Sequence, residues 1–306
     1  MKILVIGGTG FIGRHLCPFL GKDNQVFVMA RNPRGDDDSK RTGSNISYIK
    51  GDITDRDQVF AAVKGMDYVV HLASTVIPST SNADPIFDVQ TNLVGALNIL
   101  DAAVEHKIKK LVFLSSGGTV YGEGTGKPFK EDDPTNPICS YGIVKLAVEK
   151  YIQMYHQLYG VPYAILRVSN PYGPGQLGDK PQGVVSIFLD RIKRDQPIEI
   201  WGDGSTSRDF IHIDDVKMAI ASAMSSSSKQ SLINIGSGEL VSIQDLIGII
   251  SEILGKRPKV ICQPPRGFDV GSVHLSIVKA KSSIDWAPKV NLRQGLSLMA
   301  GLERKY

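Results

Sequence analysis

The chain has 306 residues, which is enough for one large domain or for two closely joined lobes with a sizeable core. Hydrophobic residues make up 42% of it and charged residues 22%, proportions typical of a folded globular protein. The formal charge is +4, but Lys and Arg alternate with Asp and Glu. This pattern argues against a basic stripe and therefore against a nucleic-acid partner.

Three cysteines, Cys17, Cys139 and Cys262, lie far apart and form no Cys-x-x-Cys pair. This argues against a disulfide framework and against a zinc site, so we expect no bound metal. The apolar start of the chain enters a glycine turn at once, without the basic region and cleavage site of a secretory signal. Since no segment approaches the roughly 20 apolar residues that span a bilayer, we expect a cytoplasmic protein with no membrane partner.

The first half of the chain alternates short apolar runs with helical patterns. The apolar runs predict strands buried on both faces, at residues 3–6, 26–29, 68–72, 111–114 and 163–168. Helical periodicity lies between them, most clearly at residues 92–106 and 141–159. Such alternation predicts the α/β class, with a doubly wound parallel sheet of the Rossmann type.

The pattern changes after residue 168. Loop-forming residues dominate from there to residue 211, and after residue 237 one clear helix is expected at 242–254. We expect a dinucleotide-binding Rossmann domain at residues 1–168, to which residues 212–236 return. A smaller C-terminal substrate-binding lobe would comprise residues 169–211 and 237–306. Two segments are expected to be solvated loops, 36–38 and 225–228.

A glycine-rich turn, GGTGFIG at residues 7–13, follows the first strand and precedes a helical pattern. Gly7, Gly10 and Gly13 have the spacing of a dinucleotide site, which needs a tight turn, close backbone approach to a pyrophosphate and close packing of helix on strand. The phosphates would lie at the positive N-terminus of the following helix, at Phe11 and Ile12. The position between strand and helix makes an ordinary turn the weaker interpretation.

Arg31 ends the second strand, where such folds usually carry an acidic residue. A carboxylate there selects NAD through the ribose 2′-hydroxyl, whereas an Arg accepts the 2′-phosphate of NADP or stacks on adenine. The preference between NAD and NADP therefore stays open. Asp52, followed by Ile53 after the third strand, is a candidate to hold the adenine amino group or simply to cap a helix.

Tyr141 and Lys145 form a Tyr-x-x-x-Lys pair at the start of a helical stretch, downstream of a strand that ends in Ser115-Ser116. The i, i+4 spacing puts both side chains on one face of a helix. A tyrosine has an ordinary pKa of about 10, and the Lys ammonium, an oxidised nicotinamide and the helix N-terminus would each favour its phenolate. We therefore expect the pKa of Tyr141 to be lowered, which suits an acid/base.

Eight segments carry a combined pattern: GGTGFIG (7–13), GDITD (51–55), HLAS (71–74), TNLVGALNIL (91–100), SSGGTVYG (115–122), YGIVK (141–145), RVSNPYGPGQ (167–176) and RDFIHIDDV (208–216). Together they resemble the extended short-chain dehydrogenase/reductases of the epimerase/dehydratase family, specifically the UDP-galactose 4-epimerase-like nucleotide-sugar enzymes. The resemblance runs from Ile3 to about Trp286, almost the whole chain.

The resemblance implies a role for each matching residue. Tyr141 would be the acid/base on the sugar hydroxyl, and Lys145 would hold the nicotinamide ribose. A bound NAD or NADP would lie along these two residues and a larger set: Gly7, Gly10, Phe11, Ile12, Gly13, Arg31, Asp52, Ile53, Leu72, Ala73, Ser74, Asn92 and Ser115.

The implied substrate is a nucleotide-activated sugar, most simply a UDP-linked hexose. Arg208 and Arg266 would clamp its diphosphate, because the planar guanidinium meets phosphate oxygens through two hydrogen bonds. Asn170 would contact the sugar or its phosphates, and Asp269 the nucleoside ribose. The full implied set is Asn170, Gly183, Val184, Arg208, Arg266 and Asp269.

Two positions depart from the family pattern. The family commonly places Ser or Thr at Gly117, so the hydroxyl that shares the proton network with Tyr141 must come from Ser116, from Thr119 or from water. Near Val273, where some relatives carry a bulky Tyr, this chain has modest side chains. An N-acetylated sugar is therefore expected to fit.

The segment before Val120-Tyr121 also narrows the reaction. Dehydratases of the family carry an acidic pair there and decarboxylases a Glu, whereas this chain has Gly117, Gly118 and Thr119. This favours 4-epimerisation: oxidation at C4, rotation of the keto sugar, and reduction on its other face. The alternative is an NADPH-dependent nucleotide-sugar reductase or a related dehydratase. A non-catalytic sensor on the same fold is disfavoured because Tyr141 and Lys145 are intact. Relatives commonly form homodimers through two helices per subunit, which the resemblance also implies here.

Overall fold

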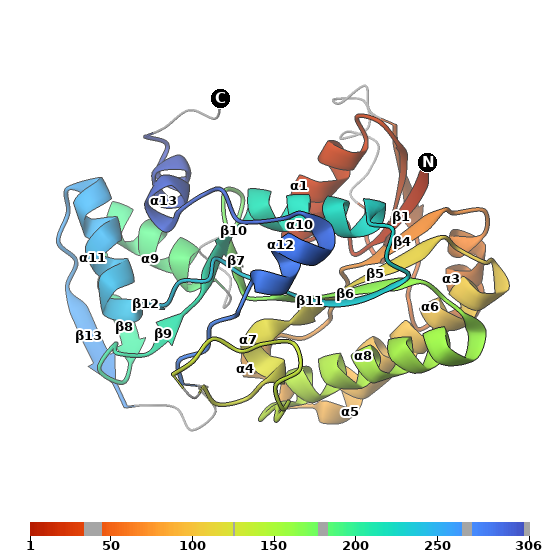
Figure 1. The fold of residues 1–306 in the computed structure, drawn as a ribbon. Coiled ribbons are helices and arrows are strands. Elements are labelled where there is room, and N and C mark those ends of the chain that lie inside the picture. The colour runs from red at the N-terminus through yellow and green to blue at the C-terminus, as the bar shows by residue number, and fades with distance from the viewer. Residues whose placement is uncertain (34–44, 125, 177–182, 265–270, 303–306) are drawn as a thin grey trace.

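A seven-stranded parallel sheet forms the centre of the molecule (Figure 1). The computed structural model describes residues 1–33, 45–124, 126–176, 183–264 and 271–302. The strand order is β11-β6-β5-β4-β1-β2-β3, and every neighbouring pair is parallel. The strands are β1 (Lys2–Ile6), β2 (Gln25–Ala30), β3 (Ile46–Lys50), β4 (Tyr68–His71), β5 (Lys110–Ser116), β6 (Tyr163–Val168) and β11 (Gln230–Ile235). The expected doubly wound parallel sheet is confirmed.

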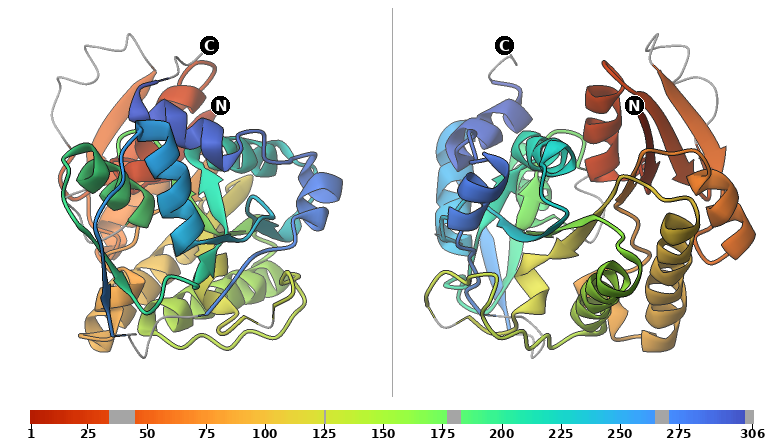
Figure 2. Two further views of the ribbon diagram at one scale, coloured as in Figure 1. Left: turned by 90° about the vertical axis from the view of Figure 1, so that its left-hand side faces the viewer. Right: turned by 45° about the vertical axis from the view of Figure 1, so that its right-hand side comes forward.

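Helices cover both faces of this sheet, as Figure 2 shows from two further directions. On one face, α1 (Phe11–Leu20), α10 (Ile213–Ser225) and α12 (Val278–Ile284) share a hydrophobic core with the strands. On the other face, α3 (Arg56–Val63), α6 (Val94–Glu105) and α8 (Ser140–Tyr159) share a second core. Because both faces are covered, the strands read as continuous apolar runs. No helix in the described part of the chain is long and apolar enough to cross a bilayer.

The expected helix at 92–106 begins later than its periodicity suggests. α6 starts at Val94, and Asn92 lies in a π-helical turn, η1 (Val89–Leu93), which follows α5 (Pro85–Asp88). At this wider turn the Asn92 side chain forms hydrogen bonds with Asp88 and Thr75. Such turns inside helices are often found at functional sites. Two further short helices, α4 (Pro78–Ser81) and α7 (Gly117–Val120), lie near the same end of the sheet.

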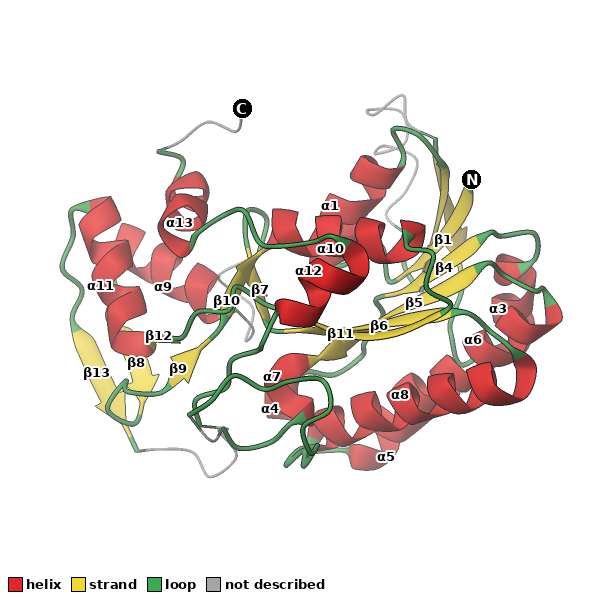
Figure 3. Cartoon of the chain, viewed as in Figure 1, coloured by secondary structure: helices red, strands yellow, loops and turns green. Residues whose placement is uncertain are grey.

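A smaller lobe stands beside the sheet (Figure 3). Its core joins apolar side chains of α9 (Val184–Lys193), α11 (Ile243–Leu254) and α13 (Leu292–Ala300). Ser242 caps α11 by accepting a hydrogen bond from the Asp245 amide, so the helix expected at 242–254 is confirmed. The lobe's strand pairs are β8 (Ile198–Trp201) with β13 (Val260–Gln263), β7 (Asn170–Tyr172) with β10 (Phe210–His212), and β9 (Ser207–Arg208) with β12 (Val241–Ser242).

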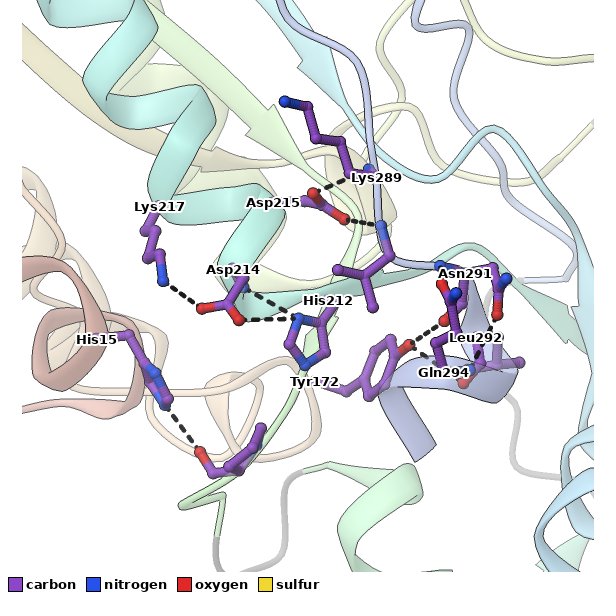
Figure 4. A network of polar contacts seen from close by, with 12 residues as sticks. His15, Tyr172, His212, Asp214, Asp215, Lys217, Lys289, Asn291, Leu292 and Gln294 are labelled. Carbon is purple, nitrogen blue, oxygen red and sulfur yellow. Dashed lines mark hydrogen bonds and ion pairs between the residues drawn. The ribbon is translucent and has the colours of Figure 1, made fainter. Parts of the chain in front are cut away.

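A polar network holds the lobe against the sheet (Figure 4). The Asp215 carboxylate on α10 accepts hydrogen bonds from the backbone amides of Lys289 and Val290, at 2.9 and 3.0 Å. The segment after these residues leads into α13, and the Tyr172 hydroxyl on β7 donates to backbone oxygens at its start. Burial raises the pKa of Asp215. Since the amides of the C-terminal segment partner this buried carboxylate, they fix where the lobe sits.

Candidate active site

The glycine turn joins β1 to α1 at the carboxyl edge of the sheet. Gly7 has φ +83°, a conformation that glycine adopts without strain, and a β-carbon there would lie 2.7 Å from the Ala73 nitrogen. A β-carbon on Gly13 would lie 2.3 Å from the Gly8 α-carbon. The turn is therefore closed to any larger residue at these two positions.

This turn fits a pyrophosphate. Gly10 precedes α1 in an extended conformation and brings no side chain to the first-turn amides of the helix. A β-carbon on Gly10 would meet only the Gly7 carbonyl, at 3.2 Å, so the backbone there can be approached closely. Phe11 and Ile12 open the helix beside these amides. Amides at a positive helix end are suited to phosphate oxygens.

The residues expected around the adenosine differ in their burial and in their hydrogen bonds within the protein. Arg31 is exposed just after β2. Asp52 is half-buried, and its Oδ1 accepts hydrogen bonds from both the amide and the hydroxyl of Thr54, at 2.9 Å each. This local turn leaves its second carboxylate oxygen for a ligand. Ile53 is buried, and a β-carbon on Gly95 of α6 would lie 2.6 Å from it, so Ile53 packs as well as lining the turn.

The loop after β4 carries Leu72, Ala73 and Ser74 along the same edge. The Leu72 amide donates to the Ile6 carbonyl at 2.9 Å, so this loop starts directly beside the glycine turn. Asn92 fixes the far end of the loop, since its Oδ1 accepts from the Thr75 amide at 3.0 Å. The structure thus brings together three separate segments of the expected cofactor residues: the glycine turn, residues 72–74 and Asn92.

Lys145 and Tyr141 lie on the first turns of α8, facing the ends of β4 and β5. The buried Lys145 ammonium donates to the Leu114 carbonyl at 2.8 Å. It lies 5.6 Å from the centre of the Tyr141 ring and 4.8 Å from that of Phe113. Because β4 lies between β5 and β1 in this parallel sheet, the pair stands at the same edge as the glycine turn. Open α/β sheets bind ligands at this edge.

The expectation of a lowered Tyr141 pKa is wrong for the chain by itself. Burial raises this pKa to about 12, and the charges of Cys139 and Asp88 raise it further, while a side-chain hydrogen bond with Ser116 lowers it. The helix N-terminus does not act alone, because the Asp88 carboxylate is also bonded at the first residue of α8. Desolvation of the phenolate outweighs the nearby ammonium.

Burial lowers the pKa of Lys145 to about 8, and the charges of Asp88 and Glu149 oppose that shift. His71, the last residue of β4, is also buried, and its Nδ1 has no partner among the described residues. Burial and the Lys145 charge lower the pKa of His71 to about 3, so it stays neutral and adds no second positive charge here.

A buried ion pair between β6 and α8 lies next to the end of β5. The Arg167 guanidinium bonds the Glu149 carboxylate of α8 at 2.7 Å, and both side chains are almost fully buried. The Ser115 hydroxyl donates to the same carboxylate. The hydroxyl of Ser115 is therefore committed to the scaffold, and any cofactor contact by this residue would use its backbone.

The structure distinguishes the two candidate hydroxyls. Ser116 shares a side-chain hydrogen bond with Tyr141. The Thr119 hydroxyl is buried and instead donates to the Ser116 carbonyl at 3.5 Å. At Gly117 there is no room for a side chain, because a β-carbon would lie 2.4 Å from Leu275 Cδ1. This arrangement favours Ser116 as the hydroxyl beside Tyr141.

Asn170, expected to meet the sugar, begins β7 at the junction with the smaller lobe. Its side-chain amide donates to the Asp209 carbonyl at 2.9 Å, and its amide group lies about 4 Å from a β-carbon built on Gly118. Asp209 is fully buried and accepts from Ser169 and Ser237. Asn170 is thus held facing the glycines that follow β5.

The other substrate candidates lie in the smaller lobe. Gly183 has φ +101° and precedes α9, which Val184 begins. The Arg208 guanidinium donates to the Gly271 carbonyl at 2.7 Å, and it is half-buried. Arg266 and Asp269 lie outside the described residues. Val273, near which an N-acetyl group was expected to fit, is buried against Tyr121 and Phe129.

Three residues around the pair gave no clear signal in the sequence. Asp88 and Glu149 are buried carboxylates linked to the pair, and His71 is the neutral imidazole at the end of β4. Glu149 follows Lys145 by four residues on one helix face, which was the one available hint. Asp88 comes from a different helix, so only the folded chain shows it.

The chain is similar to known proteins over nearly its full length. The family model described as the NAD dependent epimerase/dehydratase family matches residues 3–236. A relative from Methanocaldococcus jannaschii, provisionally assigned as a UDP-glucose 4-epimerase, is 37% identical and the match covers 96% of this chain and 95% of that protein. The UDP-glucose 4-epimerase of Mycolicibacterium smegmatis is 32% identical, over 97% and 96%.

Solved structures agree with these relatives. The Thermotoga maritima UDP-glucose 4-epimerase with UDP-glucose has a TM-score of 0.92 and 34% identity, covering 99% of this chain and 98% of that one. The Thermus thermophilus UDP-glucose 4-epimerase with NAD has a TM-score of 0.90 and 33% identity, over the same shares. With the glycine turn and the Tyr-x-x-x-Lys pair at one sheet edge, these matches show that the chain belongs to the NAD-dependent epimerase/dehydratase family.

Proposed function

We propose that the chain is an NAD-dependent 4-epimerase of nucleotide-linked hexoses, most simply of UDP-hexoses. The observation that carries the proposal is the placement of Tyr141 and Lys145 on one helix face at the sheet edge that holds the glycine turn. Relatives and neighbours named as UDP-glucose, UDP-N-acetylglucosamine and UDP-glucuronic acid 4-epimerases support it.

The glycine turn would hold the pyrophosphate of NAD, and Lys145 the nicotinamide ribose. The Thermus thermophilus and Bacillus cereus 4-epimerase structures are NAD complexes, which supports NAD over NADP although Arg31 stands at the end of β2. When bound, the nicotinamide ring supplies a reversible acceptor for the hydrogen and electron pair that leave C4 of the sugar.

The chain's own groups move the proton. Tyr141 takes the proton of the sugar 4-hydroxyl and later returns it to the same oxygen, and Ser116 holds the phenol through its hydroxyl. Lys145, fixed on the Leu114 carbonyl, stabilises the phenolate by its charge. Since the phenol of the chain alone has a pKa of about 12, a further positive charge beside it is needed near neutral pH.

The smaller lobe, residues 169–211 and 237–306 without α12, which packs on the sheet, would bind the nucleotide-sugar. We assign the sugar or its phosphates to Asn170, the nucleotide to Gly183 and Val184, and the diphosphate to Arg208. Arg266 and Asp269 would complete the diphosphate and ribose contacts. The half-buried Arg208 at the lobe junction and the fixed Asn170 support this assignment.

The experiment is to incubate the purified protein with UDP-glucose, UDP-N-acetylglucosamine or UDP-glucuronic acid, without added cofactor, and to separate the 4-epimers by chromatography. An epimerase turns over many times because its cofactor is regenerated, and Tyr141→Phe is expected to abolish this. A reductase, represented among the relatives by a dTDP-4-dehydro-6-deoxyglucose reductase at 32% identity, would instead consume NADPH stoichiometrically. No epimer from any of the three sugars would remove the proposal.

We also propose that the protein is a homodimer through α5, η1 and α8. Apolar side chains are exposed along these adjoining elements, including Ile86, Val89, Ile143 and Leu158. A shallow hollow of about 370 Å³ lies among them, lined by Pro85, Ile86, Val89 and Gln90. Exposed apolar surface of this kind marks a contact site.

The dimer is tested by light scattering after size exclusion. Ile86→Glu and Leu158→Glu are expected to yield monomers. Val278→Glu on α12 is a matched control, because Val278 is equally apolar and highly exposed but lies on the other face of the sheet. A monomeric unmodified protein would rule the dimer out.

A further inference from the structure

Asp88 is a buried carboxylate at the place where α5, η1 and α8 meet. Its side chain has no exposed surface. One oxygen accepts a hydrogen bond from the Ser140 hydroxyl at 2.8 Å, and the other accepts one from the Asn92 amide, also at 2.8 Å. Ser140 is the first residue of α8 and directly precedes Tyr141. Asp88 therefore connects the element that carries the phenol to the turn that carries Asn92.

This connection continues in both directions. On one side, Asn92 accepts from the Thr75 amide in the loop after β4, as described above. On the other, the Ser140 amide donates to the Asn82 side chain at 2.9 Å, just after α4. The start of α8 is therefore held by two side chains from outside the helix. Its N-cap residue, Cys139, contributes no side-chain bond to the first turn.

The negative charge of Asp88 affects the pKa of both Tyr141 and Lys145. It raises the pKa of Tyr141 and that of Lys145. The other groups that face the Lys145 ammonium are Glu149, which also raises its pKa, and the neutral His71. An anion near the start of a helix is itself stabilised by the helix dipole. A negative charge on Asp88 favours the cationic form of Lys145.

We propose that Asp88 is a positioning residue for the Tyr141–Lys145 pair. Its carboxylate ties the first turn of α8 to the π-helical turn at Asn92, and it supplies a fixed negative charge that keeps the Lys145 ammonium protonated. The proposal rests on the 4-epimerase function proposed above. The side chain thus has two separable roles. Its hydrogen bonds hold the start of α8, which we call the clamp, and its negative charge acts on Lys145. A different substitution tests each role.

Asp88→Asn tests the charge. The amide keeps the size of the side chain and can still bond Ser140 and Asn92, but it removes the negative charge. We expect the basic limb of the kcat/KM profile to move about one unit toward lower pH, because Lys145 then loses its proton sooner. Asp84→Asn is the matched control: Asp84 caps the same short helix, is exposed, and is replaced by an equally good cap. Its profile should match that of the unmodified protein.

Ser140→Ala tests the clamp. It removes one hydrogen bond of Asp88 and leaves the charge, so the pH profile should keep its shape while kcat falls about ten-fold. Hydrogen exchange of the first turn of α8, followed by mass spectrometry, should become faster in Ser140→Ala and stay near that of the unmodified protein in Asp88→Asn.

Two results would overturn the proposal. One is an unshifted pH profile in Asp88→Asn, and the other is unchanged hydrogen exchange in Ser140→Ala. If the unmodified protein epimerises none of the sugars, the proposed function fails, but the clamp is still decided by hydrogen exchange. The charge is then decided by the pH dependence of NAD affinity, measured by calorimetry. As the pH rises, this affinity should begin to fall at a lower pH in Asp88→Asn than in the unmodified protein.

Discussion

Leu275 fills the space that a side chain on Gly117 would need. A β-carbon at residue 117 would lie 2.4 Å from Leu275 Cδ1 and 3.1 Å from the Arg167 carbonyl oxygen. Leu275 is 1% exposed and forms a parallel bridge with Phe129. A segment that follows β13 therefore reaches the end of β5 and occupies the place where the family resemblance implied a Ser or Thr hydroxyl.

Gly117→Ser is expected to destabilise the protein by about 1–3 kcal/mol, because an added side chain overpacks a closed site. Adding Leu275→Ala should recover part of that loss, so the two substitutions should not be additive. Urea unfolding of the two single variants and the double variant measures the coupling. Additive losses would show that Leu275 does not occupy this space in solution.

Ser116→Ala should lower kcat by about 100-fold, since the hydrogen bond between Ser116 and Tyr141 lowers the pKa of the phenol. Thr119→Val should change kcat by less than about three-fold, because the Thr119 hydroxyl bonds a backbone carbonyl instead. Steady-state epimerisation of UDP-glucose compares the two. A larger loss for Thr119→Val would reverse the assignment of the hydroxyl.

The burial of Lys145 predicts a basic limit on activity. Its pKa is lowered from 10.5 to about 8, so the charge that stabilises the phenolate is lost as the pH rises through about 8. Kcat/KM of the enzyme should therefore fall above that pH. A profile that stays flat to about pH 10 would contradict this role of the ammonium.

The same shift predicts a change in stability when Lys145 is replaced. Between pH 8 and 10.5 the unfolded state binds more protons than the folded state, so the contribution of Lys145 to stability rises with pH in that window. Below pH 8 the buried ammonium lowers stability by its full amount, on the order of 3 kcal/mol. Lys145→Met should be more stable than the unmodified protein at pH 7 in urea unfolding, and this excess should shrink toward pH 10.5. A less stable variant would show that the Leu114 contact outweighs the burial of charge.

His71 predicts a loss of stability in acid. Its pKa is lowered from 6.5 to about 3. Between these two pH values, His71 is protonated in the unfolded state but stays neutral in the folded state. Stability should therefore fall as the pH drops from 6.5 toward 3, by about 3 kcal/mol near pH 4.5 from this residue alone. His71→Leu should lose less between about pH 6.5 and pH 4.5 in urea unfolding. An equal loss in both proteins would assign acid sensitivity to other groups.

Several parts of the molecule were determined by local sequence. The apolar runs at 3–6 and 163–168 became β1 and β6 because strands buried on both faces must be apolar throughout. Ser242 capped α11 as its residue type suggests. The spacing of Gly7, Gly10 and Gly13 and that of Tyr141 and Lys145 depend on a single turn or a single helix, and so could be interpreted from neighbouring residues.

The tertiary structure decided what crosses between elements. The sequence could not show that Leu275 closes the space at Gly117 or that Asp88 bonds the start of α8. Nor could it show that His71 is buried with no partner for Nδ1 in the described part of the chain. For the chain by itself, it also led to the wrong sign for the pKa shift of Tyr141, because counting nearby positive charges omits desolvation. Burial, close packing and electrostatic coupling depend on distances between segments far apart in the chain, and those distances are set only when the sheet, its helices and the smaller lobe come together.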